Sequence, residues 1–156
     1  MTDQRKRVLF VCIGNMCRSQ MAEAFARVYG SDILIPASAG VSPGYEVAED
    51  TVRAMREKHI DLRDHFPKAI RHLGRAEFDI VVNMSGLAIA YETGGKVMQW
   101  RVDDPYTASY ARHCEVRDDI ERRVMELILQ LRQESREARN QLQKPGAPSN
   151  RPPNNQ

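Results

Sequence analysis

The chain has 156 residues, which is enough for one domain with a substantial hydrophobic core. Its formal charge is +2, and residues 133–156 hold four basic and two acidic side chains, so the rest of the chain is neutral. This balance argues against a nucleic-acid-binding protein, which needs a basic face.

The sequence also argues against a membrane or secreted protein. No apolar run approaches the ~20 residues of a membrane span, and the polar residues 1–7 do not resemble a signal peptide. Three cysteines, an odd number, do not make a secreted disulfide framework. We therefore expect a cytoplasmic protein without membrane insertion.

The predicted elements alternate in type along the chain. Short apolar runs typical of strands occur at residues 8–11, 33–37, 79–83 and 97–102. Helical patterns separate them at residues 19–29, 47–58 and about 67–74. Such alternation predicts an α/β, single-domain three-layer fold with a four-stranded parallel sheet and helices on both faces. Ligands of such sheets bind beyond the carboxyl ends of the strands.

The C-terminal part of the chain changes character after its last apolar stripe. Apolar side chains at spacings of three and four between residues 116 and 131 predict a helix that faces the core. Beyond it only Leu142 is strongly apolar, and the Pro- and Asn-rich end has a disordered composition. We divide the chain into a domain over 1–132 and, over 133–156, a helix extension to about Gln143 with a disordered tail.

The segment from residue 8 to residue 20, VLFVCIGNMCRSQ, carries the clearest chemical pattern. A strand ends at Cys12, Arg18 and Ser19 follow, and a helix pattern comes next. Gly14 and Asn15 stand in the loop, where they tolerate the positive φ of a tight turn. Such a loop points backbone N–H groups and the positive helix end at one place, which makes an anion-binding cradle after the first strand.

Cys12 lies at the mouth of this predicted cradle. A helix N-terminus and a nearby Arg18 favour the thiolate form of a cysteine, and the guanidinium fork can hold two oxygens of a phosphoryl group. Together these groups suit phosphoryl transfer to sulfur, which needs no metal here. The alternative is that Cys12 only packs as a small buried hydrophobe.

With these residues in view, the loop resembles the active-site loop of the low-molecular-weight protein tyrosine phosphatase family, which includes a branch of arsenate reductases. The resemblance covers roughly residues 6–132. Its motifs are Cys12–Ser19, Ser38-Ala39-Gly40, His65 and Asp103-Asp104-Pro105-Tyr106. It implies a phosphatase-like domain with the four-stranded parallel sheet predicted above.

The resemblance also implies roles for the site residues. Cys12 is the nucleophile and Arg18 holds the phosphoryl group. Asp104, which matches the family's acid next to proline, is the general acid and then the general base, with Asp103 as the rival candidate. The residues expected to bind phosphate or substrate are Ile13, Gly14, Asn15, Met16, Cys17, Arg18, Ser19 and Tyr106, with Tyr45 as an opposite wall. Those expected to support the loop are Ser38 and His65, and no cofactor or metal is expected.

We interpret the chain as a cysteine-based protein tyrosine phosphatase, a hydrolase for phosphotyrosine or aryl phosphate monoesters that works through a phosphocysteine intermediate. Its partners would be a phosphotyrosine protein or a small aryl phosphate, with a tyrosine kinase as the source of the phosphoprotein. A third interpretation is a phosphate-binding module without turnover.

The alternative enzyme is an arsenate reductase that uses the same oxyanion loop. Gln20 favours it, because the helix start of the phosphatases has proline there. Ser85 argues against it, because the reductases that couple to thioredoxin need a cysteine at this place and another a few residues later. Cys17 or an external thiol would have to replace them. Cys17 is also expected to act as a resolving thiol when Cys12 is oxidised.

Overall fold

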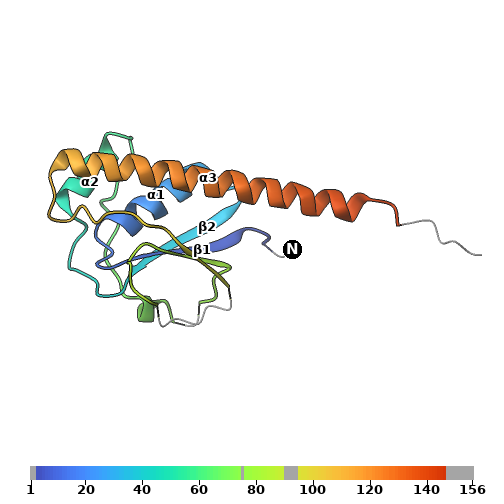
Figure 1. The fold of residues 1–156 in the computed structure, drawn as a ribbon, viewed down its shortest axis with the longest axis horizontal. Coiled ribbons are helices and arrows are strands. Elements are labelled where there is room, and N and C mark those ends of the chain that lie inside the picture. Colours follow the sequence, from blue (N-terminus) through green and yellow to red (C-terminus); the bar gives the residue numbers. More distant parts are fainter. Residues whose placement is uncertain (1–2, 75, 90–94, 147–156) are drawn as a thin grey trace, which may run out of the picture.

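Four parallel strands form one sheet in the order β2-β1-β3-β4, in a computed structural model that describes residues 3–74, 76–89 and 95–146. The strands are β1 Lys6–Cys12, β2 Leu34–Gly40, β3 Ile80–Asn83 and β4 Lys96–Gln99. The helices are α1 Arg18–Gly30, α2 Glu49–Arg56, the 3-10 helix η1 Ile70–Leu73 and α3 Tyr110–Gln143. Figure 1 shows this arrangement, with α3 as its longest element.

The alternating side chains of β1 pack into two separate cores. Val8 and Phe10 face α1, α2 and α3, where Phe25 and Ile128 are fully buried. Leu9 and its alternate neighbours face η1 and the loops around it. In Figure 1 the three α-helices accordingly lie on one side of the sheet and η1 on the other.

The fold class predicted from the sequence is confirmed, and the differences lie in the type of one helical element and in element ends. The helical pattern near residues 67–74 is a single 3-10 turn, which ends where Gly74 adopts a φ of 62°. The last strand is shorter than predicted and ends at Gln99, opposite Asn83 at the end of β3, because β3 offers no further ladder partner.

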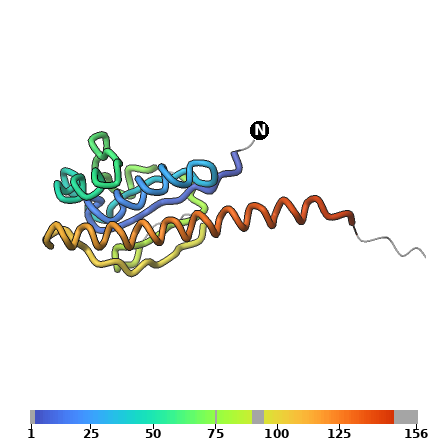
Figure 2. Tube along the Cα trace, turned by 90° about the horizontal axis from the view of Figure 1, so that it is seen from above, coloured from blue at the N-terminus to red at the C-terminus, as the bar shows by residue number. Residues whose placement is uncertain are grey.

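Helix α3 begins where Ser109 caps it by accepting the N–H of Arg112 at 3.2 Å. Its last buried side chain is Leu131, and the helix continues to Gln143 as an exposed extension that projects past the sheet (Figure 2). The tail predicted to be disordered lies outside the described residues from 147 onward. Within the described residues no helix is long and apolar enough to cross a membrane.

Two neighbouring residues of α3 test how much the helix contributes to stability. Ile128 is fully buried in the main core beside Gly30 at the end of α1, whereas 56% of Leu129 is exposed. We expect Ile128→Ala to lower the free energy of unfolding by about 2–5 kcal/mol, because it leaves a cavity in the main core. Leu129→Ala is the matched control and should change it by less than about 1 kcal/mol. Urea denaturation measures both, and equal losses would contradict this packing.

Candidate functional site

The loop after β1 is shaped by hydrogen bonds from the segment 41–48. The carbonyl groups of the loop turn outward and accept N–H groups of that segment. The pairs are Val41 N to Cys12 O at 3.1 Å, Ser42 N to Ile13 O at 2.8 Å, Gly44 N to Gly14 O at 3.0 Å and Ala48 N to Met16 O at 3.0 Å. The N–H groups of residues 13–17 donate to no atom of the described residues, so they remain available to bind an anion.

Asn15 holds the turn of this loop. Its φ is 53°, a left-handed conformation that asparagine tolerates better than most residues. Its fully buried amide donates to Ser19 Oγ at 2.6 Å and to Ser38 Oγ at 3.0 Å. Its Oδ1 accepts the N–H of Lys68 at 3.1 Å. The structure thus brings the predicted supporting residues together around the loop.

Ser19 links this network to the cysteine. The distance between Ser19 Oγ and Cys12 Sγ is 2.9 Å, and both residues are buried. Because Ser19 Oγ already accepts the amide hydrogen of Asn15, its own hydrogen is free to point at the sulfur. The hydroxyl of Ser19 is therefore placed to donate a hydrogen bond to the sulfur of Cys12.

The guanidinium group of Arg18 is held by hydrogen bonds at Nη1, whereas its Nε has no partner among the described residues. Its side chain is only 5% exposed, and Nη1 donates to the carbonyl oxygens of Met84 and, at 3.0 Å, of Val102. Nε is buried and has no partner among the described residues. A buried guanidinium N–H without a partner is costly unless a ligand accepts it, so Nε is suited to bind an oxyanion.

The structure separates the two candidate aspartates. Asp104 Oδ2 lies 3.5 Å from Arg18 Nη2, and Asp104 Oδ1 accepts the N–H of Tyr106 at 3.1 Å. Asp103 instead forms an ion pair with Arg112 on α3. Asp104, whose side chain is 45% exposed, is therefore the carboxylate placed beside the loop.

Gln20 contributes more to the site than the sequence indicated. Its Nε2 donates to Asn15 O at 3.1 Å and to Asn15 Oδ1 at 3.0 Å, and its Oε1 lies 2.8 Å from His65 Nδ1. An amide oxygen only accepts, so Nδ1 of His65 carries the hydrogen. Burial lowers the pKa of His65 although Glu23 lies 3.3 Å away. His65 thus supports the loop through Gln20. The only hint in the sequence was that Gln20 differs from the phosphatases.

Cys17 is turned away from solvent. It is 3% exposed, and burial raises the pKa of its thiol to about 12 although Thr51 hydrogen-bonds to it. Thr51 Oγ1 in turn lies 3.3 Å from Nδ1 of the buried His113. The thiol of Cys17 is therefore a weak nucleophile in this conformation, because the thiolate is the reactive form.

A hollow of about 660 Å³ opens beside the loop. Met16, Tyr45 and Tyr106 line it, and both tyrosines are exposed, as expected for the walls of a substrate site.

Ser85 is buried near the carbonyl of Met84 that holds Arg18, and its hydroxyl donates to Asn83 Oδ1 at 2.6 Å. Among the described residues no cluster of three His, Cys, Asp or Glu side chains could hold a metal ion.

The fold and the site together define an enzyme class with a cysteine at the mouth of an oxyanion-binding loop, at the carboxyl edge of a parallel sheet. Comparison with known proteins agrees with this class. Residues 7–93 match the low molecular weight phosphotyrosine protein phosphatase family, to which the chain belongs.

The similar proteins carry two kinds of name. Arsenate reductase 1 of Bacillus cereus is 33% identical over 126 residues, which cover 78% of this chain and 93% of that protein. The glutaredoxin arsenate reductase of Synechocystis is 29% identical over 130 residues, which cover 81% and 98% of the two chains. The structure of an arsenate reductase in the phosphate binding state has a TM-score of 0.74 at 29% identity, and the comparison covers 81% and 98% of the two chains.

A second kind of solved structure is a mutant of the YwlE arginine phosphatase with a phosphorylated active-site serine. Its TM-score is 0.72 at 28% identity, with 83% of this chain and 98% of that one covered. The chain is therefore similar both to reductases of arsenate and to a phosphatase. The family alone does not establish that tyrosine is the dephosphorylated residue.

Gly40 provides a test of the loop geometry. A Cβ at this position would lie 2.8 Å from Ile13 O and 2.9 Å from Asn15 N, which are backbone atoms that cannot move independently. We expect Gly40→Ala to weaken inorganic phosphate binding at least tenfold and to destabilise the protein by about 1–3 kcal/mol. Isothermal titration with phosphate and thermal denaturation measure the two effects.

Gly146→Ala is the matched control, because a Cβ there would meet nothing within 4 Å. If Gly40→Ala bound phosphate as tightly as this control, the close contact between β2 and the loop would not shape the anion site.

Proposed function

We propose that the chain is an arsenate reductase in which Cys12 takes up the oxyanion and a thiol of another molecule completes the reduction. The observation that carries the proposal is Gln20. The resemblance favours a reductase at this position, because the phosphatases have proline there and proline has no side-chain amide. In this chain the amide of Gln20 donates to Asn15 and so helps to hold the turn of the loop. The similar proteins named arsenate reductase support the same choice.

The proposed reaction follows from the geometry of the loop. The free N–H groups and Arg18 Nε bind arsenate. The Cys12 thiolate forms a sulfur–arsenic bond as one arsenic–oxygen bond breaks, and the hydroxyl group that leaves takes up a proton from solvent and departs as water. A thiol then attacks Cys12 Sγ. The sulfur–arsenic bond breaks with its electron pair on arsenic, so arsenate is reduced to arsenite while two thiols are oxidised to a disulfide.

The second thiol is proposed to come from outside the chain. Ser85 stands in the loop after β3, where the relay of a thioredoxin-coupled reductase would need one cysteine and another a few residues later, and residues 83–100 contain no cysteine. The chain has only three cysteines, and Cys17 is buried with a raised pKa. A small-molecule thiol or a glutaredoxin-like protein would therefore complete the step.

Hydrolysis of aryl phosphate monoesters, including phosphotyrosine, is the second candidate. Asp104 favours it, because its carboxylate lies beside Arg18 and can protonate a leaving oxygen and later activate water. Tyr45 and Tyr106 line the hollow, where an aromatic leaving group could stack. Both reactions use Cys12 as the nucleophile, and they differ in whether a thiol is consumed.

The two activities should be measured side by side on the same preparation. We expect arsenite formation that depends on added glutathione or glutaredoxin, and its loss in Cys12→Ser because an alcohol does not form the thiolate. Cys17→Ser should keep the rate of the wild type, since the second thiol is external. Loss of reduction in Cys17→Ser would instead assign that step to Cys17. Hydrolysis of p-nitrophenyl phosphate without arsenate reduction would make the chain a phosphatase, and binding of phosphate without either turnover would make it a binding module.

The role of Asp104 is tested with a series of aryl phosphates. Asp104→Asn should slow substrates with poor leaving groups by roughly 10²-fold or more, and those with good leaving groups much less, because only the former need a proton. The slope of rate against leaving-group pKa measures this difference. Asp103→Asn is the control and should leave the slope unchanged, since Asp103 pairs with Arg112. A wild-type slope in Asp104→Asn would exclude it as the acid.

A further inference from the structure

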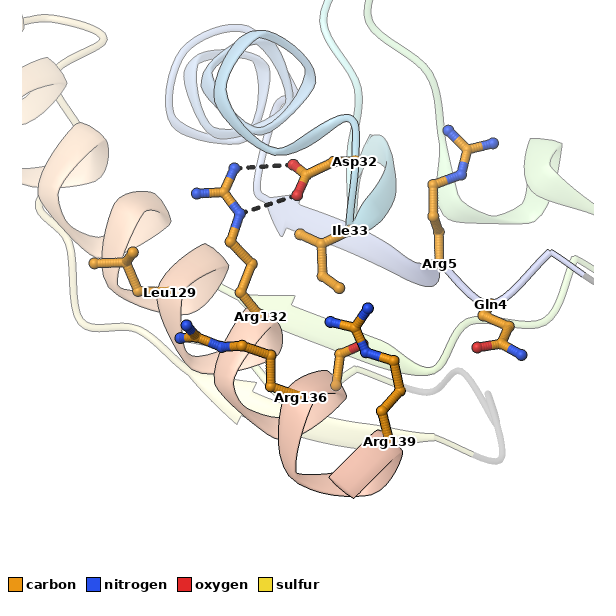
Figure 3. A pocket seen from close by; sticks show the side chains of 9 residues that line it. Gln4, Arg5, Asp32, Ile33, Leu129, Arg132, Arg136 and Arg139 are labelled. Carbon is orange, nitrogen blue, oxygen red and sulfur yellow. Dashed lines mark hydrogen bonds and ion pairs between the residues drawn. The ribbon is translucent and has the colours of Figure 1, made fainter. Parts of the chain in front are cut away.

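A groove of about 710 Å³ lies at the amino edge of the sheet, opposite the edge that carries Cys12. It is bounded by the residues before β1, the turn between α1 and β2, and the exposed end of α3 (Figure 3). Four arginines line it: Arg5, Arg132, Arg136 and Arg139. Ile33 and Leu129 add apolar surface, and Leu129 is 56% exposed.

The four arginines differ in how they are held. Arg132 binds both carboxylate oxygens of Asp32, at 2.9 and 3.0 Å, and Arg5 pairs with Asp3 at 2.7 Å. Figure 3 shows the fork of Arg132 on Asp32. The side chains of Arg136 and Arg139 form no ion pair or hydrogen bond with any of the described residues. The groove therefore has two guanidinium groups held by carboxylates and two that form no ion pair in the described part of the chain.

The end of α3 that carries Arg136 and Arg139 is not packed into the domain core. From residue 133 to residue 143 α3 is exposed except at Ser135, which is half-buried, so the domain core does not stabilise this stretch. The spacings of three and four residues put Leu129, Arg132, Arg136 and Arg139 on one face of α3, toward the groove. A basic, partly apolar face on a helix that the core does not support is suited to binding another molecule.

We propose that this groove binds an acidic segment of a partner protein, whose carboxylates pair with Arg136 and Arg139 and whose aliphatic side chain packs on Ile33 and Leu129. Charge complementarity carries this choice, because guanidinium forks match carboxylates. The concave form favours a chain segment over a flat lipid surface, and the net charge of +2 is small for a protein that binds nucleic acid. The site is separate from the Cys12 loop and does not depend on the proposed reaction.

Fluorescence anisotropy with a labelled peptide of glutamates around one leucine tests the proposal on the full chain. We expect the wild type to bind this peptide and not its glutamine analogue, with an affinity that falls as salt rises. The double variant Arg136→Gln/Arg139→Gln should weaken binding about tenfold. Hydrogen exchange over residues 133–143 should slow when the peptide is bound, because the lone helix gains a partner.

The matched control is Arg63→Gln/Arg122→Gln, which removes the same charge from side chains that are 80% and 60% exposed outside the groove. It should keep wild-type affinity, and a loss equal to that of the groove variant would overturn the proposal in favour of bulk charge. Failure of the wild type to bind the peptide at low salt would also overturn it. A third outcome would overturn it as well: the wild type sediments with phosphatidylserine vesicles, the groove variant does not, and the peptide does not compete with the vesicles. Turnover at Cys12 should be unchanged in both double variants.

Discussion

The backbone of Asn15 turns at a φ of 53°, and its side-chain amide ties the loop after β1 to Ser19, Ser38 and the backbone of Lys68. This one buried amide decides the direction of the loop. With it in place, the loop carbonyls accept N–H groups of the segment 41–48, and the N–H groups of residues 13–17 have no partner in the part of the chain that the structure describes. The charge-binding capacity of the site is therefore prepared before any anion arrives, which is how an enzyme avoids reorganisation during the reaction.

The surroundings of the loop protect that arrangement. Gly40 lets β2 approach the loop backbone closely, and Gln20, itself paired with His65, donates to Asn15. Arg18 is held from behind by carbonyl groups that follow β3 and β4. Each contact comes from a different element, so the site is rigid only in the complete fold. A phosphatase and an arsenate reductase can share it, because phosphate and arsenate are oxyanions of the same shape and the distinguishing step is the second one.

The two edges of the sheet carry opposite kinds of surface. The carboxyl edge holds the Cys12 loop, Asp104 and a hollow lined by tyrosines, whereas the amino edge holds a basic groove extended by α3. Parallel strands make this division possible, since all loops that follow strands meet at one edge and all turns that precede them meet at the other. A partner at the groove would leave the reacting loop open.

The sequence by itself determined the fold class, the strand–loop–helix pattern at Cys12, and the pairing of this loop with the motif at Asp104, because apolar periodicity and motif order are local properties of the chain. The resemblance of the sequence already favoured Asp104 over Asp103 as the acid, and only the tertiary structure placed Asp104 beside Arg18 and paired Asp103 with Arg112 from a helix later in the chain. It also decided that Gln20 stands between His65 and Asn15, and that Cys17 is buried against Thr51. These are contacts between distant segments, whose hydrogen-bond partners and burial no local pattern specifies. The basic groove likewise forms only when residues before β1 and the end of α3, more than a hundred positions apart, meet at one edge of the sheet.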